Sequence, residues 1–144
     1  MRFPFINMRT AIFQAKYENL DAIREYVAQA AKDAGFDEAG IYSVQLAADE
    51  ACSNIIEYAY NAVDDGEIEC TCSQDGKNLV IIFRDHGCCF DPASVPEPIL
   101  TGELNERHIG GLGIYLIRHL MDEVHYESLG EAGNVLTLKK HLMG

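Results

Sequence analysis

The stretch that decides the fold is residues 67–74, EIECTCSQ, in which apolar and polar side chains alternate. One side of this extended chain would carry Ile68, Cys70 and Cys72. The other side would carry acidic and hydroxyl side chains: Glu67, Glu69 and Thr71. This pattern is typical of a strand with one buried and one solvated face. Because apolar helices cannot cover a row of carboxylates, the stretch predicts a sheet with helices on one face only.

The flanking sequence supplies the other elements. Apolar spacing predicts strands over residues 9–15, 79–83, 124–128 and 135–141. Helical spacing predicts one helix from Asn19 to Gly35, a second from Asp37 that frays near Asn61, and a third from Leu112 to Met121. The pair Asp75-Gly76 is a hairpin signal. The irregular residues 86–110, rich in proline and glycine, are predicted to form a lid or binding loop.

The order β-α-α-β-β-loop-α-β-β predicts one α/β domain over residues 1–144. We expect a two-layer sandwich, with a mixed sheet and three helices on one face.

Composition limits the possible functions. The chain has 144 residues, of which 48% are hydrophobic and 24% charged, as expected for a globular domain. The net charge of −12 disfavours nucleic-acid binding, and any anionic ligand would need local compensation. No apolar run reaches the length of about 18 residues that spans a bilayer. Five cysteines, two of them adjacent, do not form a disulfide framework, so we expect a reduced, cytoplasmic protein without membrane partners.

A first candidate site lies in the second predicted helix. Glu50, Asn54 and Tyr58 are spaced by four residues and share one stripe beside the apolar face. A carboxylate can accept a proton, and an amide oxygen suits Mg²⁺. An ordinary solvated helix face explains the spacing equally well.

Two glycine-containing stretches form the other candidate sites. Residues 83–92 end a buried strand in Asp85-x-Gly87, where the carboxylate could accept a hydrogen bond from an exocyclic amine. A simple strand-ending turn is the alternative. Residues 107–115 place three glycines before a helix, as in an anion-binding nest, with Arg107 nearby. A flexible hinge is the alternative there.

The cysteines at 70 and 72 suggest core packing more than metal binding, because both would point inward. The chain has no G-x-x-x-x-G-K-[ST] and no G-x-G-x-x-G motif.

In this order and spacing, the three stretches resemble the N box, G1 box and G2 box of GHKL-type ATPases. The resemblance is strongest to the anti-sigma-factor serine/threonine kinases of bacterial partner-switching systems, the RsbW and SpoIIAB type, and it covers nearly the whole chain. The motifs are DEACSN at 49–54, D-x-G-x-x-F-D-P at 85–92 and GGLGIYLIR at 110–118. The resemblance implies a Bergerat-type fold.

The resemblance also implies roles for the matching residues. Glu50 would be the general base that activates a serine hydroxyl, and Asn54 would hold Mg²⁺. Asp85 would recognise the adenine amine, with Gly87 giving it room and Thr137 nearby. The phosphates would be bound by the remaining residues of the site: Arg107, Gly111, Leu112 and Gly113. Cys88 and Cys89 stand where many relatives have small or apolar residues.

The implied function is that of an ATP- and Mg²⁺-dependent protein-serine kinase. It would bind a sigma factor and phosphorylate a STAS-type anti-anti-sigma protein, and the resemblance also allows a homodimer. A nucleotide-dependent binding module with little or no kinase activity is the alternative, although such a module would not need Glu50. A histidine kinase is disfavoured, because neither of the first two helices presents a histidine.

Overall fold

The structure is a computed structural model that describes residues 6–60, 66–88 and 109–142. The strands are β1 (Ile6–Gln14), β2 (Glu67–Asp75), β3 (Asn78–Asp85), β4 (Glu123–Ser128) and β5 (Asn134–His141). The long helices are α1 (Leu20–Asp33), α2 (Glu38–Asn54) and α3 (Ile109–Leu120). The short helical turns are η1 (Tyr17–Asn19), η2 (Ile55–Ala59) and η5 (Gly130–Ala132). All five strands and all three long helices were predicted from the sequence.

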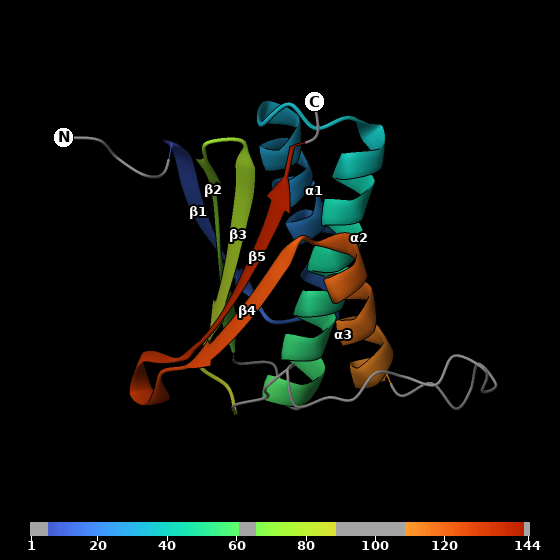
Figure 1. Cartoon of the computed structure of the whole chain (residues 1–144). Coiled ribbons are helices and arrows are strands. Elements are labelled where there is room, and N and C mark those ends of the chain that lie inside the picture. Colours follow the sequence, from blue (N-terminus) through green and yellow to red (C-terminus); the bar gives the residue numbers. More distant parts are fainter. Residues whose placement is uncertain (1–5, 61–65, 89–108, 143–144) are drawn as a thin grey trace.

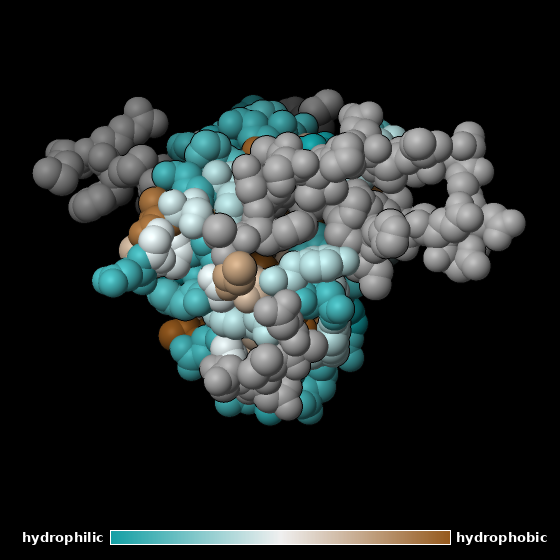
Figure 2. All heavy atoms as spheres, turned by 90° about the horizontal axis from the view of Figure 1, so that it is seen from below, coloured by the Kyte–Doolittle hydropathy of each residue, from teal (hydrophilic) through white to brown (hydrophobic). Residues whose placement is uncertain are grey.

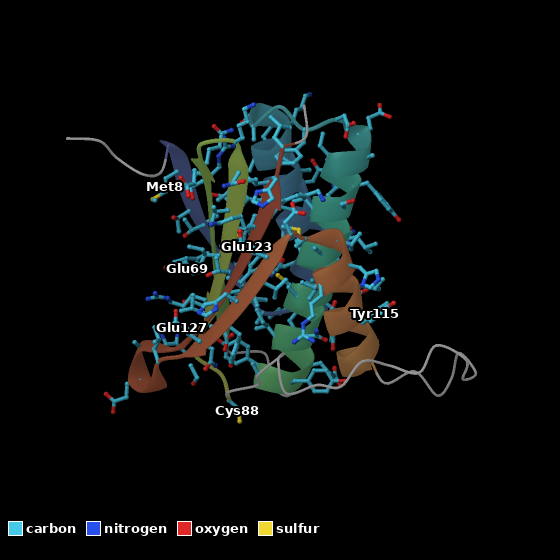
Figure 3. The ribbon with its side chains drawn as sticks, in the orientation of Figure 1. Met8, Glu69, Cys88, Tyr115, Glu123 and Glu127 are labelled. Carbon is cyan, nitrogen blue, oxygen red and sulfur yellow. The ribbon has the colours of Figure 1, made fainter. Side chains whose placement is uncertain are left out.

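The molecule has two layers, with the three long helices on one face of a five-stranded sheet (Figure 1). The predicted two-layer sandwich is therefore confirmed. The predicted alternation along β2 is confirmed as well: Ile68, Cys70 and Cys72 are buried against the helices. Glu69 lies on the side of the sheet away from the helices (Figure 3).

The sheet is antiparallel and not mixed, which corrects one part of the prediction. The strand order is β1-β2-β3-β5-β4, and every described pairing is antiparallel. Two long helices, α1 and α2, lie between β1 and β2 in the chain (Figure 1). Each of them runs back along the sheet in turn, so β2 starts where β1 ends and runs antiparallel to it. The strands β3 and β4 do run the same way, since one helix joins them, but β5 lies between them. A parallel pair would have required these two strands to be neighbours.

Local sequence explains how the central helix begins. Gly35 adopts a φ of 96°, which favours glycine and ends the preceding helix. The Asp37 side chain then caps α2 by accepting a hydrogen bond from the Gly40 amide at 2.8 Å. The helix α2 runs between α1 and α3 (Figure 1). Its buried face is made of small residues: Val44, Ala47, Ala48, Ala51 and Cys52.

Two predicted boundaries differ from the observed ones. The β2–β3 turn consists of Gly76 and Lys77, one residue later than predicted, because Asp75 still pairs with Asn78. Gly76 supplies the positive φ of 63° that the turn requires. The third helix begins at Ile109, three residues earlier than predicted. Most of the predicted 86–110 loop lies outside the described residues.

Candidate nucleotide site

The three candidate stretches converge at one end of the molecule, where β3 and η2 finish and α3 begins (Figure 1). Cys88 marks this end of the sheet, and Tyr115 marks the neighbouring helix α3 (Figure 3). The chain after β3 contacts η2 directly, because the Cys88 amide donates a hydrogen bond of 2.7 Å to the carbonyl of Ala59, the last residue of η2. The described surface at this end is mostly hydrophilic, with a small apolar area near its centre (Figure 2).

Asn54 is the most informative residue of α2, because it is a polar side chain without a partner. It is 3% exposed, and neither its amide oxygen nor its amide nitrogen has a hydrogen-bond partner among the described residues. Leaving such a group unsatisfied costs about 1–3 kcal/mol. The alternative of a solvated helix face does not fit a buried side chain. An orphaned buried amide fits a residue whose partner is a bound ligand.

The Asn54 amide oxygen is also a type of ligand that Mg²⁺ accepts. Mg²⁺ commonly uses one or two protein ligands together with water and phosphate oxygens. No group of three histidine, cysteine, aspartate or glutamate side chains in the described part of the chain could hold a metal ion by itself. A cation here would therefore depend on Asn54 together with the phosphates of a nucleotide.

Glu50 lies one helical turn before Asn54 and is half-buried. Burial raises the pKa of the Glu50 carboxyl, and the negative charge of the adjacent Asp49 raises this pKa further. Asp49 itself is held by Arg24 of α1, whose guanidinium lies 2.6 Å from its carboxylate. A half-buried carboxyl with a raised pKa is the kind of group that can act as a general base near neutral pH.

Asp85 ends β3 as a buried carboxylate, 4% exposed. Its Oδ1 accepts hydrogen bonds of 2.9 Å from the Gly87 amide and from the Asn134 side chain. The Asn134 side chain also donates to the Gly87 carbonyl at 3.0 Å. The bond from the Gly87 amide, two residues on, is an Asx turn, as the strand-ending alternative predicts, and the bond from Asn134 ties this turn to β5.

Gly87 is required by a close approach of two backbones. A Cβ atom at this position would come within 2.6 Å of the Ala59 carbonyl carbon, a backbone atom that cannot move aside easily. The glycine therefore lets the loop after β3 pack onto the end of η2. This contact brings Asp85 and Asn54 to the same end of the sandwich.

Tyr60, to which the sequence assigned no role, connects the elements at this end of the molecule. Its hydroxyl donates to the Glu67 carbonyl at 2.7 Å and accepts from the His86 amide at 2.8 Å. It therefore ties the end of η2 to both β2 and β3. The preceding turn η2 is a π-helix, a feature that is frequent at functional sites. The Ala59-Tyr60 pair after the helix was the available sequence signal.

The described part of the third stretch, residues 109–115, is helical and does not precede α3 as a loop. Gly111 and Leu112 belong to the first turn of α3, and Gly113 begins the second. The first four amides of a helix have no partner within it, so an anion could still bind there. Arg107 lies outside the described residues.

Comparison with known proteins identifies the family. The model of the histidine kinase-like ATPase domain matches residues 13–140. The serine-protein kinase RsbW of Bacillus cereus is 32% identical, over 98% of this chain and 87% of the relative. The serine/threonine-protein kinase BtrW of Bordetella bronchiseptica is 31% identical, over 69% of this chain and 70% of the relative. This chain belongs to the histidine kinase-like ATPase family. The family model supports ATP use, and the named kinases support kinase activity for this member.

A solved structure shares the fold of this histidine kinase-like ATPase domain. A Mycobacterium tuberculosis chain that contains RsbU and RsbW domains aligns with a TM-score of 0.64 and 19% identity. The alignment covers 94% of this chain and 32% of the solved one. At that identity the likeness supports the fold alone.

The structure decides the facing of Thr137, which the sequence left open. Leu136 and Leu138 of β5 are buried in the core, so Thr137 between them faces the opposite, open side of the sheet. Asn134 has the same parity as the two leucines and faces the helix side, where it bonds Asp85. A one-residue change in strand register exchanges the two faces, and the sequence did not fix the register of β5.

The cysteines of this ATPase domain behave mainly as core residues. Cys52, Cys70 and Cys72 are buried, which confirms the packing interpretation. The side-chain hydrogen bond with Cys72, and then burial, raise the pKa of the Cys70 thiol, so the thiolate is disfavoured. Cys88 is exposed beside the site, whereas Cys89 lies outside the described residues. In the described ranges, no helix combines the length and apolar character needed to cross a membrane.

Proposed function

We propose that this ATPase-family chain is an ATP- and Mg²⁺-dependent protein-serine kinase that acts as an anti-sigma factor. It would bind a sigma factor and phosphorylate the antagonist of that interaction, a STAS-type protein, on a serine. The single observation that carries the proposal is the buried, unpartnered amide of Asn54, one turn from the half-buried carboxyl of Glu50. This pair supplies a ligand for the cation and a base for the hydroxyl.

The residues around the proposed nucleotide divide its recognition among three elements. Asp85 at the end of β3 would accept a hydrogen bond from the adenine amine. The free amides of the first turn of α3, including those of Gly111 and Leu112, would face the phosphates, with Gly113 in the next turn giving them room and Arg107 adding positive charge. Asn54 would hold Mg²⁺, which when bound neutralises phosphate charge. Local compensation of this kind is needed in a chain of net charge −12.

Glu50 would accept the proton of the attacking serine hydroxyl. Its raised pKa suits this role, because a base is most effective when its pKa approaches the working pH. Phosphoryl transfer otherwise depends mainly on positioning and charge neutralisation. A module that only binds nucleotide would gain nothing from a half-buried carboxyl at this place.

The catalytic proposal is tested by phosphate transfer from labelled ATP to a purified STAS-type antagonist. Glu50→Gln keeps the shape of the side chain and cannot take a proton, so the rate should fall by about 10²–10⁴. ATP affinity should hardly change. Glu38→Gln, in the exposed first turn of the same helix, is the matched control and should transfer phosphate normally. Transfer at the wild-type rate by Glu50→Gln would place the base elsewhere.

A second variant separates metal binding from base catalysis. Asn54→Ala removes the proposed Mg²⁺ ligand, and both ATP affinity and transfer rate should fall together. If the wild-type protein binds ATP tightly and transfers phosphate to no antagonist, the binding-module alternative is favoured. Complex formation with sigma factors and the homodimer are tested by size-exclusion chromatography with light scattering, in ADP and in ATP.

A further inference from the structure

Three polar side chains form a row across three strands beside the proposed nucleotide site. Asp85 of β3 pairs with Asn134 of β5, which in turn pairs with Ser128 of β4. The Ser128 hydroxyl donates to the Asn134 amide oxygen at 3.0 Å, and the Asn134 amide nitrogen donates to Asp85 Oδ1 at 2.9 Å. The row therefore connects the strand at the edge of the sheet to the buried carboxylate.

Two groups that can only accept, Asp85 Oδ1 and the Gly87 carbonyl, determine which way the Asn134 amide points, and Ser128 holds its other end. An asparagine amide has one acceptor end and one donor end. Because the Asp85 carboxylate and the Gly87 carbonyl can only accept, the nitrogen faces them and uses both of its hydrogens, and the Ser128 hydroxyl donates to the amide oxygen that remains. Asn134 is 3% exposed, and both polar atoms of its buried amide have hydrogen-bond partners. The buried amide is thus held in a single orientation.

The consequence falls on Asp85. Its Oδ1 already accepts two hydrogen bonds, from Gly87 and Asn134, whereas Oδ2 has no protein partner among the described residues. The carboxylate cannot rotate without breaking both bonds. It therefore offers one acceptor oxygen in one fixed direction.

We propose that Asn134, whose amide oxygen is held by Ser128, is a positioning residue that sets the nucleobase preference of the site. The inference rests on the proposed nucleotide function. A fixed carboxylate oxygen bonds a 6-amino group and repels a 6-carbonyl oxygen, so the row selects adenine against 6-oxopurines such as guanine and hypoxanthine. Without the row, Asp85 can turn, and the discrimination weakens before binding is lost.

The test measures the affinity of the whole protein for ATP and for inosine triphosphate by calorimetry, without any activity assay. Ser128→Ala removes one exposed hydroxyl and should lower the preference for ATP by about threefold to tenfold. Ser128→Thr keeps a hydroxyl and should restore the preference. Asn134→Leu should lower it by about tenfold or more.

The matched control is Thr10→Ala, which removes a side-chain hydrogen bond of 3.0 Å to Thr71 elsewhere in the same sheet. It should leave the preference unchanged. A preference unaltered in both Ser128→Ala and Asn134→Leu overturns the inference. Because Ser128 is exposed, its variant remains informative even if Asn134→Leu does not fold. Failure of the wild-type protein to bind either nucleotide overturns the proposed function together with the inference, whereas loss of phosphate transfer alone leaves the inference standing.

Discussion

Replacing Asn54 with leucine should stabilise the nucleotide-free protein and abolish nucleotide binding. Both polar atoms of this buried amide lack a partner among the described residues, so the folded state bears their desolvation cost. Leucine has the same branching and the same number of side-chain heavy atoms and no polar atom, but it is larger, so overpacking offsets part of the gain. Removing the unsatisfied group should recover about 1–3 kcal/mol. For a chain of this length, 1 kcal/mol corresponds to roughly 2–4 °C in Tm, so a gain of about 2 kcal/mol raises Tm by roughly 4–8 °C.

The assay is thermal unfolding by calorimetry, with and without Mg²⁺ and ATP. At a ligand concentration 100 times the Kd, binding stabilises a folded protein by about 2.7 kcal/mol. The wild-type Tm should therefore rise on adding nucleotide, whereas the Tm of Asn54→Leu should not move. The variant would be the more stable protein without nucleotide and the less stable one with it.

Asn134→Leu is the matched control. The wild-type Asn134 side chain is as buried as that of Asn54, each 3% exposed, but the Asn134 amide makes three hydrogen bonds. Losing them leaves the buried Asp85 carboxylate with the Gly87 amide alone and the Gly87 carbonyl without its side-chain donor, so this variant should melt below the wild type. A lower Tm for Asn54→Leu than for the wild type, both without nucleotide, would refute the reasoning. It would mean that the Asn54 amide is satisfied in the folded protein.

Three further predictions concern the same site. Because the pKa of Glu50 is raised, the transfer rate should fall with decreasing pH already above the ordinary glutamate pKa, and Asp49→Asn should move this acid limb to lower pH in a pH–rate profile. The free energy of unfolding depends on pH in the opposite sense to the rate. The protonated Glu50 favours the folded state, and this contribution to stability is lost as pH rises through the raised pKa. Gly87→Ala should destabilise by about 1–3 kcal/mol and weaken ATP binding, whereas Gly76→Ala, strained in its turn but free of contacts, should lose stability alone in the same denaturation and binding measurements. Tyr60→Phe should cost about 1–2 kcal/mol in urea unfolding and speed amide exchange at His86, and unchanged exchange there would contradict the tie.

Much of this protein follows from the sequence alone. The alternation at 67–74 required one solvated sheet face, because carboxylates cannot be buried under apolar helices. Helical spacing and the cap at Asp37 located α2, and a four-residue interval placed Glu50 and Asn54 on one side of it. Local rules sufficed here because neighbours along the chain decide helical and extended periodicity.

Tertiary structure decided what depends on residues that are distant in sequence. Strand order is one case: β5 inserts between β3 and β4 and makes an antiparallel sheet of one expected to be mixed. Strand register is another, because it turned Thr137 to the open face and brought Asn134 to Asp85, 49 residues away in the chain. The burial of Asn54 without a partner is a third, since only packing determines whether a polar atom on a helix meets water, protein or a ligand.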